Sequence, residues 1–238
     1  MQIVISRDYE FIRDWIESIP RRFEYEGSSI YKGRNEVRLL KAPNNMPVCI
    51  KKYCCPNPIK RVIYTYFRSP KAVRAYNNAT TLFIRGIESP APIAYLIEYK
   101  HGLIGESYLL TRYCEYTRNF YEFRHHPLEG YENIVKDFAR FSARMHNQCV
   151  YHKDYSPGNI IFDVHNGRTD FSIIDINRMI FPKEVTMTQG CKNFARLWGK
   201  EDFFLLLAEE YAKCRGFDVK ECQRLVVKYW KRFWRFRK

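Results

Sequence analysis

The sequence lacks the features that would assign it to a zinc-binding, secreted or membrane-spanning class. Its eight cysteines include no C-x-x-C pair and are not accompanied by histidines at zinc-finger spacing, so they do not indicate structural zinc. No segment approaches the roughly 18 to 20 apolar residues of a transmembrane helix, and the opening residues MQIVISRDYE do not resemble a secretory signal. We therefore expect a cytoplasmic chain with reduced thiols.

Repeats, low-complexity tracts and Gly/Ser linkers are also absent, since the 11 glycines and 11 prolines are dispersed. Apolar residues make up 46% of the chain and charged residues 28%, which is typical of a globular protein and not of a disordered one. A length of 238 residues is enough for one large domain or for two small lobes that share a cleft.

Acidic residues are scarce: 26 oppose 40 lysines and arginines, which gives a net charge of +14. Such an excess indicates an anionic partner, either a nucleic acid, a phosphorylated sugar, a nucleotide or a membrane surface. Aromatic residues alternate with cations in the terminal run YWKRFWRFRK, a pattern that also occurs in nucleic-acid-binding proteins. No recognised nucleic-acid motif accompanies it, so we do not expect nucleic acid as a partner.

The hydrophobic patterning predicts an α+β protein with two lobes, an antiparallel-sheet N-lobe over residues 1–116 and a mainly helical C-lobe over residues 117–238. In the first lobe, we expect a helix over residues 9–18 that Pro20 ends, because proline breaks a helix interior. The lobe should continue with strands in EVRLLK and PVCIKKY, a helix over residues 71–84, and strands in IAYLIEYK and ESYLLTRYC.

The string YHKDYSPGNIIFD carries the most specific chemical signal. It places His152, Asp154 and Asn159 at H-x-D-x-x-x-x-N spacing, which is the spacing of the protein-kinase catalytic loop. A kinase needs a carboxylate that accepts or orients the proton of the attacking hydroxyl, and an amide oxygen that holds magnesium. In FSIIDINR, Asp175 follows an apolar strand and could supply a second magnesium ligand.

The N-lobe offers candidates for contacts with nucleotide phosphates. The string VCIK resembles the V-A-I-K strand of kinases and points to Lys51, whereas a register slip would give the role to Lys52. Gly27 and Gly33 in EGSSIYKGRNE could bring backbone amides close to phosphates, or could serve a plain hairpin turn.

From about Phe23 to Leu207, the sequence resembles the lipopolysaccharide kinase family, the Kdo and core-heptose kinases within the protein-kinase-like superfamily. The ending IIDINR is similar to that family's D-x-x-R, with Arg178 as the arginine, and EGSSIYKGRNE and GIESPAPIAY are also similar to family members. The resemblance implies that Asp154 is the catalytic base, that Asn159 and Asp175 hold Mg2+, and that Lys51 contacts ATP. It also implies a glycolipid acceptor, a sugar hydroxyl on a lipid A or core precursor at the inner membrane.

Three positions depart from the kinase pattern. The helix over residues 71–84 carries Asn77 and Asn78 where a glutamate would pair with Lys51, Asn177 stands in place of the glycine of D-F-G, and Lys153 replaces the arginine of H-R-D. These departures leave two alternatives to a lipopolysaccharide kinase: a pseudokinase scaffold that binds nucleotide, and a small-molecule kinase of the aminoglycoside or choline type.

The last twenty residues hold eight cations and one carboxylate, which is half of the net positive charge. Periodicity predicts a helix from Val219 onward, with aromatic residues such as Trp230 on one face and cations on the other. Such a helix could lie peripherally on an anionic membrane, or could pack on the C-lobe with its basic face in solvent.

Overall fold

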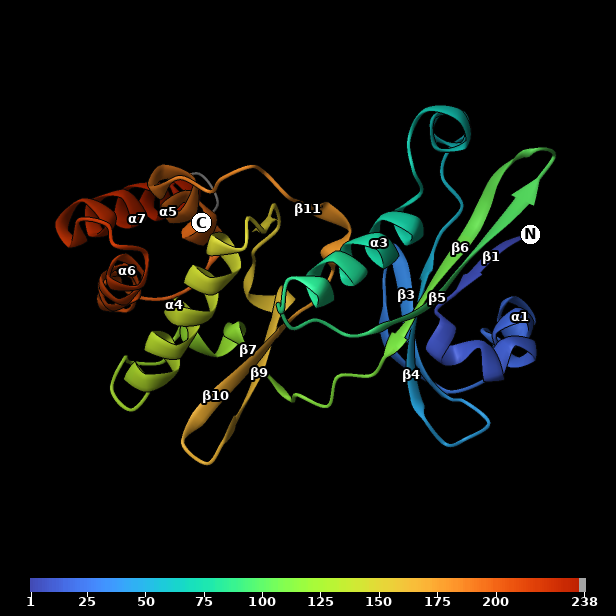
Figure 1. Ribbon diagram of the computed structural model, residues 1–238, viewed down its shortest axis with the longest axis horizontal. Helices are drawn as coiled ribbons and strands as arrows, with labels where there is room; N and C mark the ends of the chain where they lie inside the picture. The colour runs from blue at the N-terminus through green and yellow to red at the C-terminus, as the bar shows by residue number, and fades with distance from the viewer. Residues whose placement is uncertain (236–238) are drawn as a thin grey trace. The chain divides into compact units, whose positions relative to one another are not determined.

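A computed structural model describes residues 1–235, which form two compact units (Figure 1). The amino-terminal unit comprises Met1–Ile84 and Pro90–Cys114. The carboxy-terminal unit comprises Arg85–Ser89 and the described chain from Glu115 onward. The predicted α+β class is confirmed, because the first unit is built on an antiparallel sheet and the second is mainly helical.

A six-stranded sheet forms the centre of the amino-terminal unit. Its strands are β1 (Gln2–Ile5), β2 (Ser28–Lys32), β3 (Asn35–Lys41), β4 (Pro47–Tyr53), β5 (Pro92–Lys100) and β6 (Leu103–Arg112). They lie in the order β1-β5-β6-β4-β3-β2, and every neighbouring pair is antiparallel. Side chains alternate between the two faces of such a sheet, so that consecutive residues of β4 have different surroundings.

Helix α1 (Arg13–Arg22) covers one face of this sheet and follows the 3-10 turn η1 (Arg7–Ile12). The prediction that Pro20 ends this helix is wrong, since two more helical residues follow it and the Phe23 amide donates to the Ile19 carbonyl at 2.8 Å. A proline in a helix interior removes its own amide donor and crowds the carbonyl four residues earlier. Here the buried contacts of the helix with the sheet offset that loss; they are made by Trp15, Ile16, Ile19 and Phe23.

Helix α3 (Lys71–Ile84) covers the opposite face, with the bounds that the sequence predicts (Figure 1). It packs on β5 and β6, where the Tyr76 ring meets the Tyr95 ring edge-on at 5.3 Å. Its buried positions recur at three- to four-residue spacing and are mostly small, which lets the helix approach the sheet closely. They are Ala72, Ala75, Ala79 and Leu82.

Between β4 and α3, the sequence analysis missed a helical segment. It consists of α2 (Pro58–Val62) and the π-helical turn η2 (Ile63–Phe67). Asn57 caps the segment, because its side-chain oxygen accepts a hydrogen bond from the Lys60 amide at 3.0 Å and a proline occupies the first helical position. The Arg61 guanidinium ties α2 to the β5–β6 hairpin by donating to backbone carbonyls of that hairpin.

The carboxy-terminal unit combines small sheets with four α-helices. Its strands are β7 (Arg118–Asn119), β8 (Tyr151–His152), β9 (Ile160–His165), β10 (Arg168–Ile173) and β11 (Met179–Ile180), which pair as β10-β9-β7 and β11-β8. The α-helices are α4 (Glu132–Asn147), α5 (Met187–Asn193), α6 (Glu201–Arg215) and α7 (Val219–Trp234). Short 3-10 turns are η3 (Phe120–Arg124), η4 (Pro157–Asn159), η5 (Ile176–Arg178) and η6 (Phe194–Arg196).

An aromatic core joins these elements. The Phe138 ring of α4 lies 4.2 Å from the Phe120 ring and 5.6 Å from the Tyr155 ring, centroid to centroid. Tyr155 is fully buried, and its hydroxyl is hydrogen-bonded to that of Ser142 at 2.9 Å. The buried Tyr155–Ser142 hydrogen bond therefore fixes the loop between β8 and β9 to α4 inside an apolar core.

The terminal helix α7 packs on the carboxy-terminal unit, as the second of the two alternatives predicts. Its Trp230 ring stacks on Phe204 of α6 at 4.5 Å, and the Trp234 indole donates to the Leu197 carbonyl at 3.1 Å. Cys222 and Val226 are fully buried. Arg237 and Lys238 of the basic terminus lie outside the described residues, and within residues 1–235 no helix is both long and apolar enough to cross a bilayer.

Candidate active site

The loop after β8 is held in shape by His152. The side chain is fully buried, its Nδ1 accepts a hydrogen bond from the Asp154 amide at 3.0 Å, and its Nε2 lies 3.2 Å from the Ile174 carbonyl. Because Nδ1 is an acceptor, Nε2 carries the proton and donates to that carbonyl. Burial lowers the pKa of His152, which favours this neutral form. The histidine thus links the loop to the residue that precedes Asp175.

Two arginines clamp the Asp154 carboxylate. Arg196 donates to Oδ1 at 2.6 Å and Arg178 approaches Oδ2 at 3.2 Å, while the Asp154 side chain is 23% exposed. The D-x-x-R resemblance indicates Arg178 but gives no sign of Arg196, which follows 42 residues after Asp154. A carboxylate held from both oxygens has a defined orientation and stays accessible to an acceptor hydroxyl.

Hydrogen bonds join Asn159 to the Asp154 loop and to the residue that precedes Asp175. The Asn159 amide nitrogen donates to the Asp154 carbonyl at 2.8 Å, and the Ile174 amide donates to the Asn159 carbonyl at 3.0 Å. Asp175 then adopts a left-handed backbone with φ of 54°, and the Asn177 amide group donates to its Oδ1 at 2.7 Å. Asparagine in place of the D-F-G glycine therefore orients the aspartate.

The donor atoms of this group suit magnesium. With its nitrogen committed to the loop, Asn159 presents its amide oxygen, and Asp175 presents a carboxylate. Mg2+ prefers such hard oxygen ligands and is commonly bound by one or two carboxylates together with substrate phosphates. Across residues 1–235 no three His, Cys, Asp or Glu side chains form a metal-binding group.

Behind the loop lies a buried polar network that sequence reasoning missed. The Asn193 amide nitrogen donates to the His152 carbonyl at 2.8 Å, and its oxygen lies 3.0 Å from His146 Nε2. His146 Nδ1 in turn lies 2.9 Å from the Tyr211 hydroxyl, which accepts from Arg215. Complete burial lowers the pKa of His146 to about 4, so the ring is neutral at pH 7.

The amino-terminal unit separates the two lysines at the end of β4. Lys52 lies on the face that α1 covers and forms ion pairs with Glu24 at 2.6 Å and Glu106 at 3.0 Å. Lys51 lies on the face of α3, with its ammonium group 5.5 Å from the centre of the Tyr53 ring. The strand register therefore leaves Lys51 as the candidate for nucleotide phosphates and accounts for Lys52 by its carboxylate partners.

The two glycines of the first hairpin differ in environment. Gly27 precedes β2 with φ of +71°, and a side chain there would come within 2.2 Å of the Leu39 carbonyl, so close packing on β3 explains this glycine. Gly33 lies in the turn between β2 and β3, where its amide donates to the Asn35 carbonyl at 3.0 Å. Of the two, Gly33 is the one at the tip of the hairpin.

The glutamate that commonly pairs with the kinase lysine has no counterpart in α3. The whole helix, KAVRAYNNATTLFI, contains no carboxylate. Asn77 is exposed, whereas Asn78 is partly buried at a position three residues after Ala75, on the side that packs on the sheet. An asparagine there can orient an ammonium group by hydrogen bonding without neutralising its charge.

Comparison with known proteins shows which family and which solved structures this chain is similar to. Residues 57–203, more than half of the chain, match the lipopolysaccharide kinase (Kdo/WaaP) family. The structure is similar to WaaP in complex with acyl carrier protein, with a TM-score of 0.66 and 15% identity over 100% of both chains. It is also similar to the Rio2 kinase ADP/Mg2+-phosphoaspartate complex from Chaetomium thermophilum, with a TM-score of 0.50 and 10% identity over 92% of this chain and 68% of that one.

No curated protein matches the sequence. At 15% and 10% identity the two structures establish the fold, and both support the two-lobed protein-kinase-like architecture predicted from the sequence. The family match covers the catalytic loop, Asp175 and Arg178. The chain belongs to the lipopolysaccharide kinase (Kdo/WaaP) family and is a kinase.

Proposed function

We propose that this kinase uses ATP and Mg2+ to phosphorylate a sugar hydroxyl of a lipopolysaccharide precursor, with Asp154 as the catalytic residue. The observation that supports this most directly is the loop that holds Asp154 between Arg178 and Arg196 and ties Asn159 to its backbone. A phosphoryl transfer depends mainly on positioning and charge stabilisation, and these contacts provide positioning.

Each polar group of the loop then has a distinct role. Asp154 accepts or orients the proton of the acceptor hydroxyl, and the arginines keep its carboxylate directed toward that hydroxyl. Asn159 and Asp175 would hold magnesium, which neutralises charge on the phosphates. On the amino-terminal unit, Lys51 contacts the phosphates of ATP, and the backbone amides of the Gly33 turn would cover those phosphates.

Two rival functions lose support. A pseudokinase scaffold would have no need for the full set of Asp154, Asn159 and Asp175 with their supporting contacts. A small-molecule kinase would use the same loop, but the family match favours an acceptor of the lipopolysaccharide type. Because such an acceptor is lipid-linked, the enzyme would work in the cytoplasm as a peripheral protein of the inner membrane.

The test measures ATP turnover with magnesium, with and without a lipid A or Kdo-containing acceptor. We expect acceptor-stimulated turnover that falls by about 100-fold or more in Asp154→Ala, the scale of a lost general base. It should also be lost in Asp175→Ala, through the loss of a magnesium ligand. Lys51→Gln should raise the KM for ATP, whereas Lys52→Gln, a matched change on the other face of β4, should not. Asp8→Ala, at an exposed carboxylate outside the loop, serves as the charge control.

Two results would count against the proposal. Turnover that survives in Asp154→Ala would remove that residue from the catalytic role. A natural chain that binds ATP but is stimulated only by aminoglycosides or choline would assign the small-molecule alternative.

A further inference from the structure

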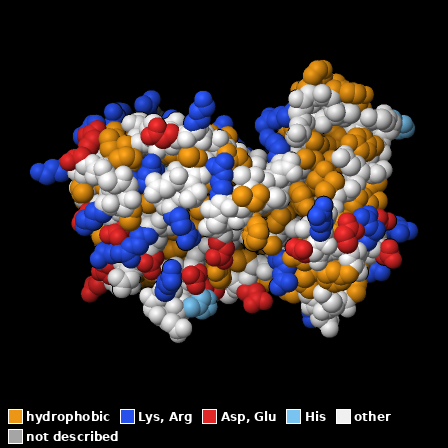
Figure 2. All heavy atoms as spheres, in the orientation of Figure 1, with side chains coloured by type: hydrophobic (Ala, Val, Ile, Leu, Met, Phe, Trp, Pro, Cys, Tyr) orange, Lys and Arg blue, Asp and Glu red, His pale blue; other side chains and the backbone are white. Residues whose placement is uncertain are grey.

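The α2–η2 segment exposes an unusual number of large apolar side chains. Figure 2 shows hydrophobic atoms gathered at the projecting tip of the amino-terminal unit, where Figure 1 places the teal helical segment after β4. A short helix that exposes this much apolar surface has no partner within its own unit that buries it, which is characteristic of an interaction surface. The exposed fractions are Ile59 75%, Val62 41%, Ile63 40%, Tyr66 67% and Phe67 81%.

The stretch of chain that contains this segment carries charge of one sign, although Lys52 within it pairs with Glu24 and Glu106 from outside the stretch. Between Glu36 and Glu88 the sequence contains no aspartate or glutamate at all. An apolar surface set in a purely cationic stretch complements a surface that is apolar inside and negative outside, which is the organisation of an anionic bilayer. The cations of this stretch are Arg38, Lys41, Lys51, Lys52, Lys60, Arg61, Arg68, Lys71, Arg74 and Arg85.

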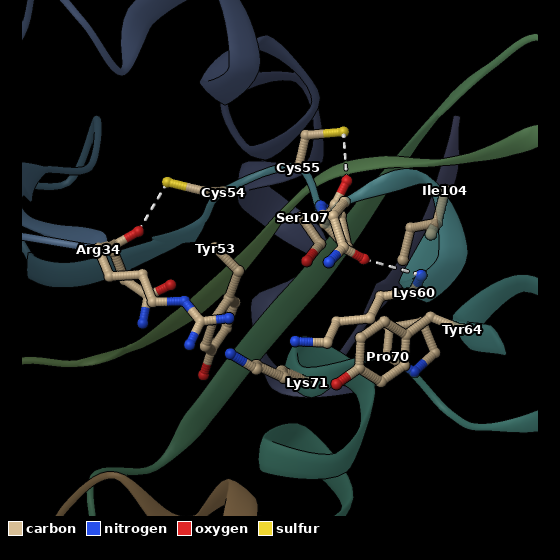
Figure 3. A pocket seen from close by; sticks show the side chains of 13 residues that line it. Arg34, Tyr53, Cys54, Cys55, Lys60, Tyr64, Pro70, Lys71, Ile104 and Ser107 are labelled. Atoms are coloured by element: carbon tan, nitrogen blue, oxygen red, sulfur yellow. Dashed lines mark hydrogen bonds between the residues drawn. The ribbon is translucent and has the colours of Figure 1, made fainter. Parts of the chain in front are cut away.

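A pocket lies directly beside the apolar surface and is lined by residues of the amino-terminal unit alone. It has a volume of about 140 Å3, and no carboxylate is among its lining residues. Figure 3 shows the ammonium groups of Lys60 and Lys71 and the guanidinium of Arg34 directed toward the same part of it. A single buried water needs about 10 to 15 Å3 on this kind of measure, so the pocket has room for a phosphate group.

Tyrosine hydroxyls and further cations complete the surroundings. Tyr53 and Tyr64 line the pocket and can donate hydrogen bonds to an anion. Arg74 interacts electrostatically with both tyrosines, and its Nε is buried without a hydrogen-bond partner. Burial, and repulsion by the nearby Arg68, lower the pKa of Arg74 because both disfavour its charged form. A bound anion would relieve that repulsion.

From these observations we infer that residues 58–68 form a membrane-contact surface, with the apolar side chains in the interface of an anionic bilayer and a lipid headgroup phosphate in the adjacent pocket. Both kinds of cation are suited to this phosphate contact. Lysine offers a compact positive charge, and the planar guanidinium of arginine can donate two parallel hydrogen bonds to a phosphate. We assign membrane contact to residues 58–68 and not to the terminal helix, because the apolar face of α7 packs on α6.

The inference is compatible with the proposed kinase function and rests on it only for the choice of a lipid-linked acceptor. Bilayer binding is measured without ATP or acceptor, and phosphoryl transfer is measured on the variants named above. A chain that transfers phosphate but does not bind vesicles would overturn the inference alone. A chain that binds vesicles but does not transfer phosphate would overturn the proposed function alone.

The experiment is co-sedimentation of the full chain with vesicles of phosphatidylcholine alone or of phosphatidylcholine with phosphatidylglycerol. We expect binding that requires the anionic lipid and weakens with salt. Ile59→Ser with Phe67→Ser should weaken it about tenfold or more, since two large apolar side chains no longer enter the interface. Lys60→Gln with Lys71→Gln should weaken it by about fivefold per lysine.

Matched controls separate the surface from general effects of apolarity and charge. Phe83 on α3 is 78% exposed, close to the value for Phe67, and Lys41 is an exposed cation outside the pocket. Phe83→Ser and Lys41→Gln should bind vesicles as the natural chain does, and a thermal unfolding curve for each variant confirms that it is folded. Equal losses in the controls, or full binding by both double variants, would overturn the assignment.

Inorganic phosphate and water-soluble glycerol phosphate distinguish a headgroup in a bilayer from a free anion. We expect neither to displace the chain from anionic vesicles at millimolar concentration, because the apolar side chains add contacts that a soluble anion cannot make. Displacement at that concentration would show a site for a free phosphate and would overturn the membrane assignment.

Discussion

Acidification should destabilise the protein through His146. Its pKa is about 4 in the folded chain, against an ordinary value of 6.5 that applies after unfolding. Between these values the unfolded chain binds a proton that the folded chain does not, so the stability that is present above pH 6.5 is lost as the pH falls toward 4. With about 1.4 kcal/mol per pH unit, the loss is about 2 kcal/mol at pH 5 and approaches about 3 kcal/mol below pH 4.

The structural cause of this loss is the chain of hydrogen bonds through His146. A proton on Nδ1 would abolish the acceptor that faces the Tyr211 hydroxyl, and the positive ring would lie near Arg215. The site has no carboxylate partner in the network, since Asn193 and Tyr211 are its hydrogen-bonding neighbours. Protonation therefore costs both a hydrogen bond and the burial of an unpaired charge.

Urea unfolding at pH 7.5, 6.5, 5.5 and 4.5 tests this in the natural chain and in His146→Gln. The free energy of unfolding of the natural chain should fall more steeply with acid than that of the variant, by about 2–3 kcal/mol between pH 7.5 and 4.5. Burial also lowers the pKa of His152, so His152 adds to the pH dependence of stability in both proteins. Its contribution cancels when the unfolding free energy of the variant is subtracted from that of the natural chain. His125→Gln, at an exposed position, should keep the slope of the natural chain. A constant difference between natural chain and His146→Gln at all pH values would refute the reasoning.

Two further predictions concern residues that the family pattern does not name. Asn193→Ala removes the hydrogen bonds to the His152 carbonyl and to His146 Nε2, so it should lower stability by about 1–3 kcal/mol. It should also lower kcat with little change in the KM for ATP. A rise in that KM as large as the fall in kcat would contradict a role confined to the catalytic loop. Trp230→Ala should destabilise the fold by about 2–4 kcal/mol in thermal unfolding, because it removes the ring stacked on Phe204. Vesicle binding should be unchanged. A loss of binding without a loss of stability would instead assign the membrane contact to α7.

The sequence was sufficient wherever the signal is local. The H-x-D-x-x-x-x-N spacing, the strand before Asp175 and the helix over residues 71–84 each lie within a few residues of chain. In the structure, hydrogen bonds join Asn159 to the Asp154 carbonyl and to the amide of Ile174, the residue before Asp175. Local rules failed where a longer-range contact outweighed them. Pro20 remains inside α1 because buried contacts with the sheet hold the last turn.

Residues joined only by the fold could not be found in this way. Arg196 reaches Asp154 across 42 positions, and Asn193 connects two histidines that belong to different elements. No spacing rule links such residues, since the tertiary fold sets the distances from η6 and α5 to the loop after β8 and to α4. One missed element did carry a signal: asparagine followed by proline at positions 57 and 58 is a helix start, although the following KRVIYTYF has the β-branched and aromatic composition of a strand.

That composition also explains why α2–η2 is a weak helix former placed on the outside of the protein. Val, Ile, Thr, Tyr and Phe cost helix stability, and an exposed helix normally offsets such residues with a buried face. Here the apolar side chains stay exposed, and the backbone is fixed instead by the cap at Asn57 and by Arg61, which binds the β5–β6 hairpin. This segment keeps costly apolar residues out of its own core, and it lies within a stretch of chain that has no carboxylate between Glu36 and Glu88. An external apolar and anionic contact therefore explains its composition better than folding does.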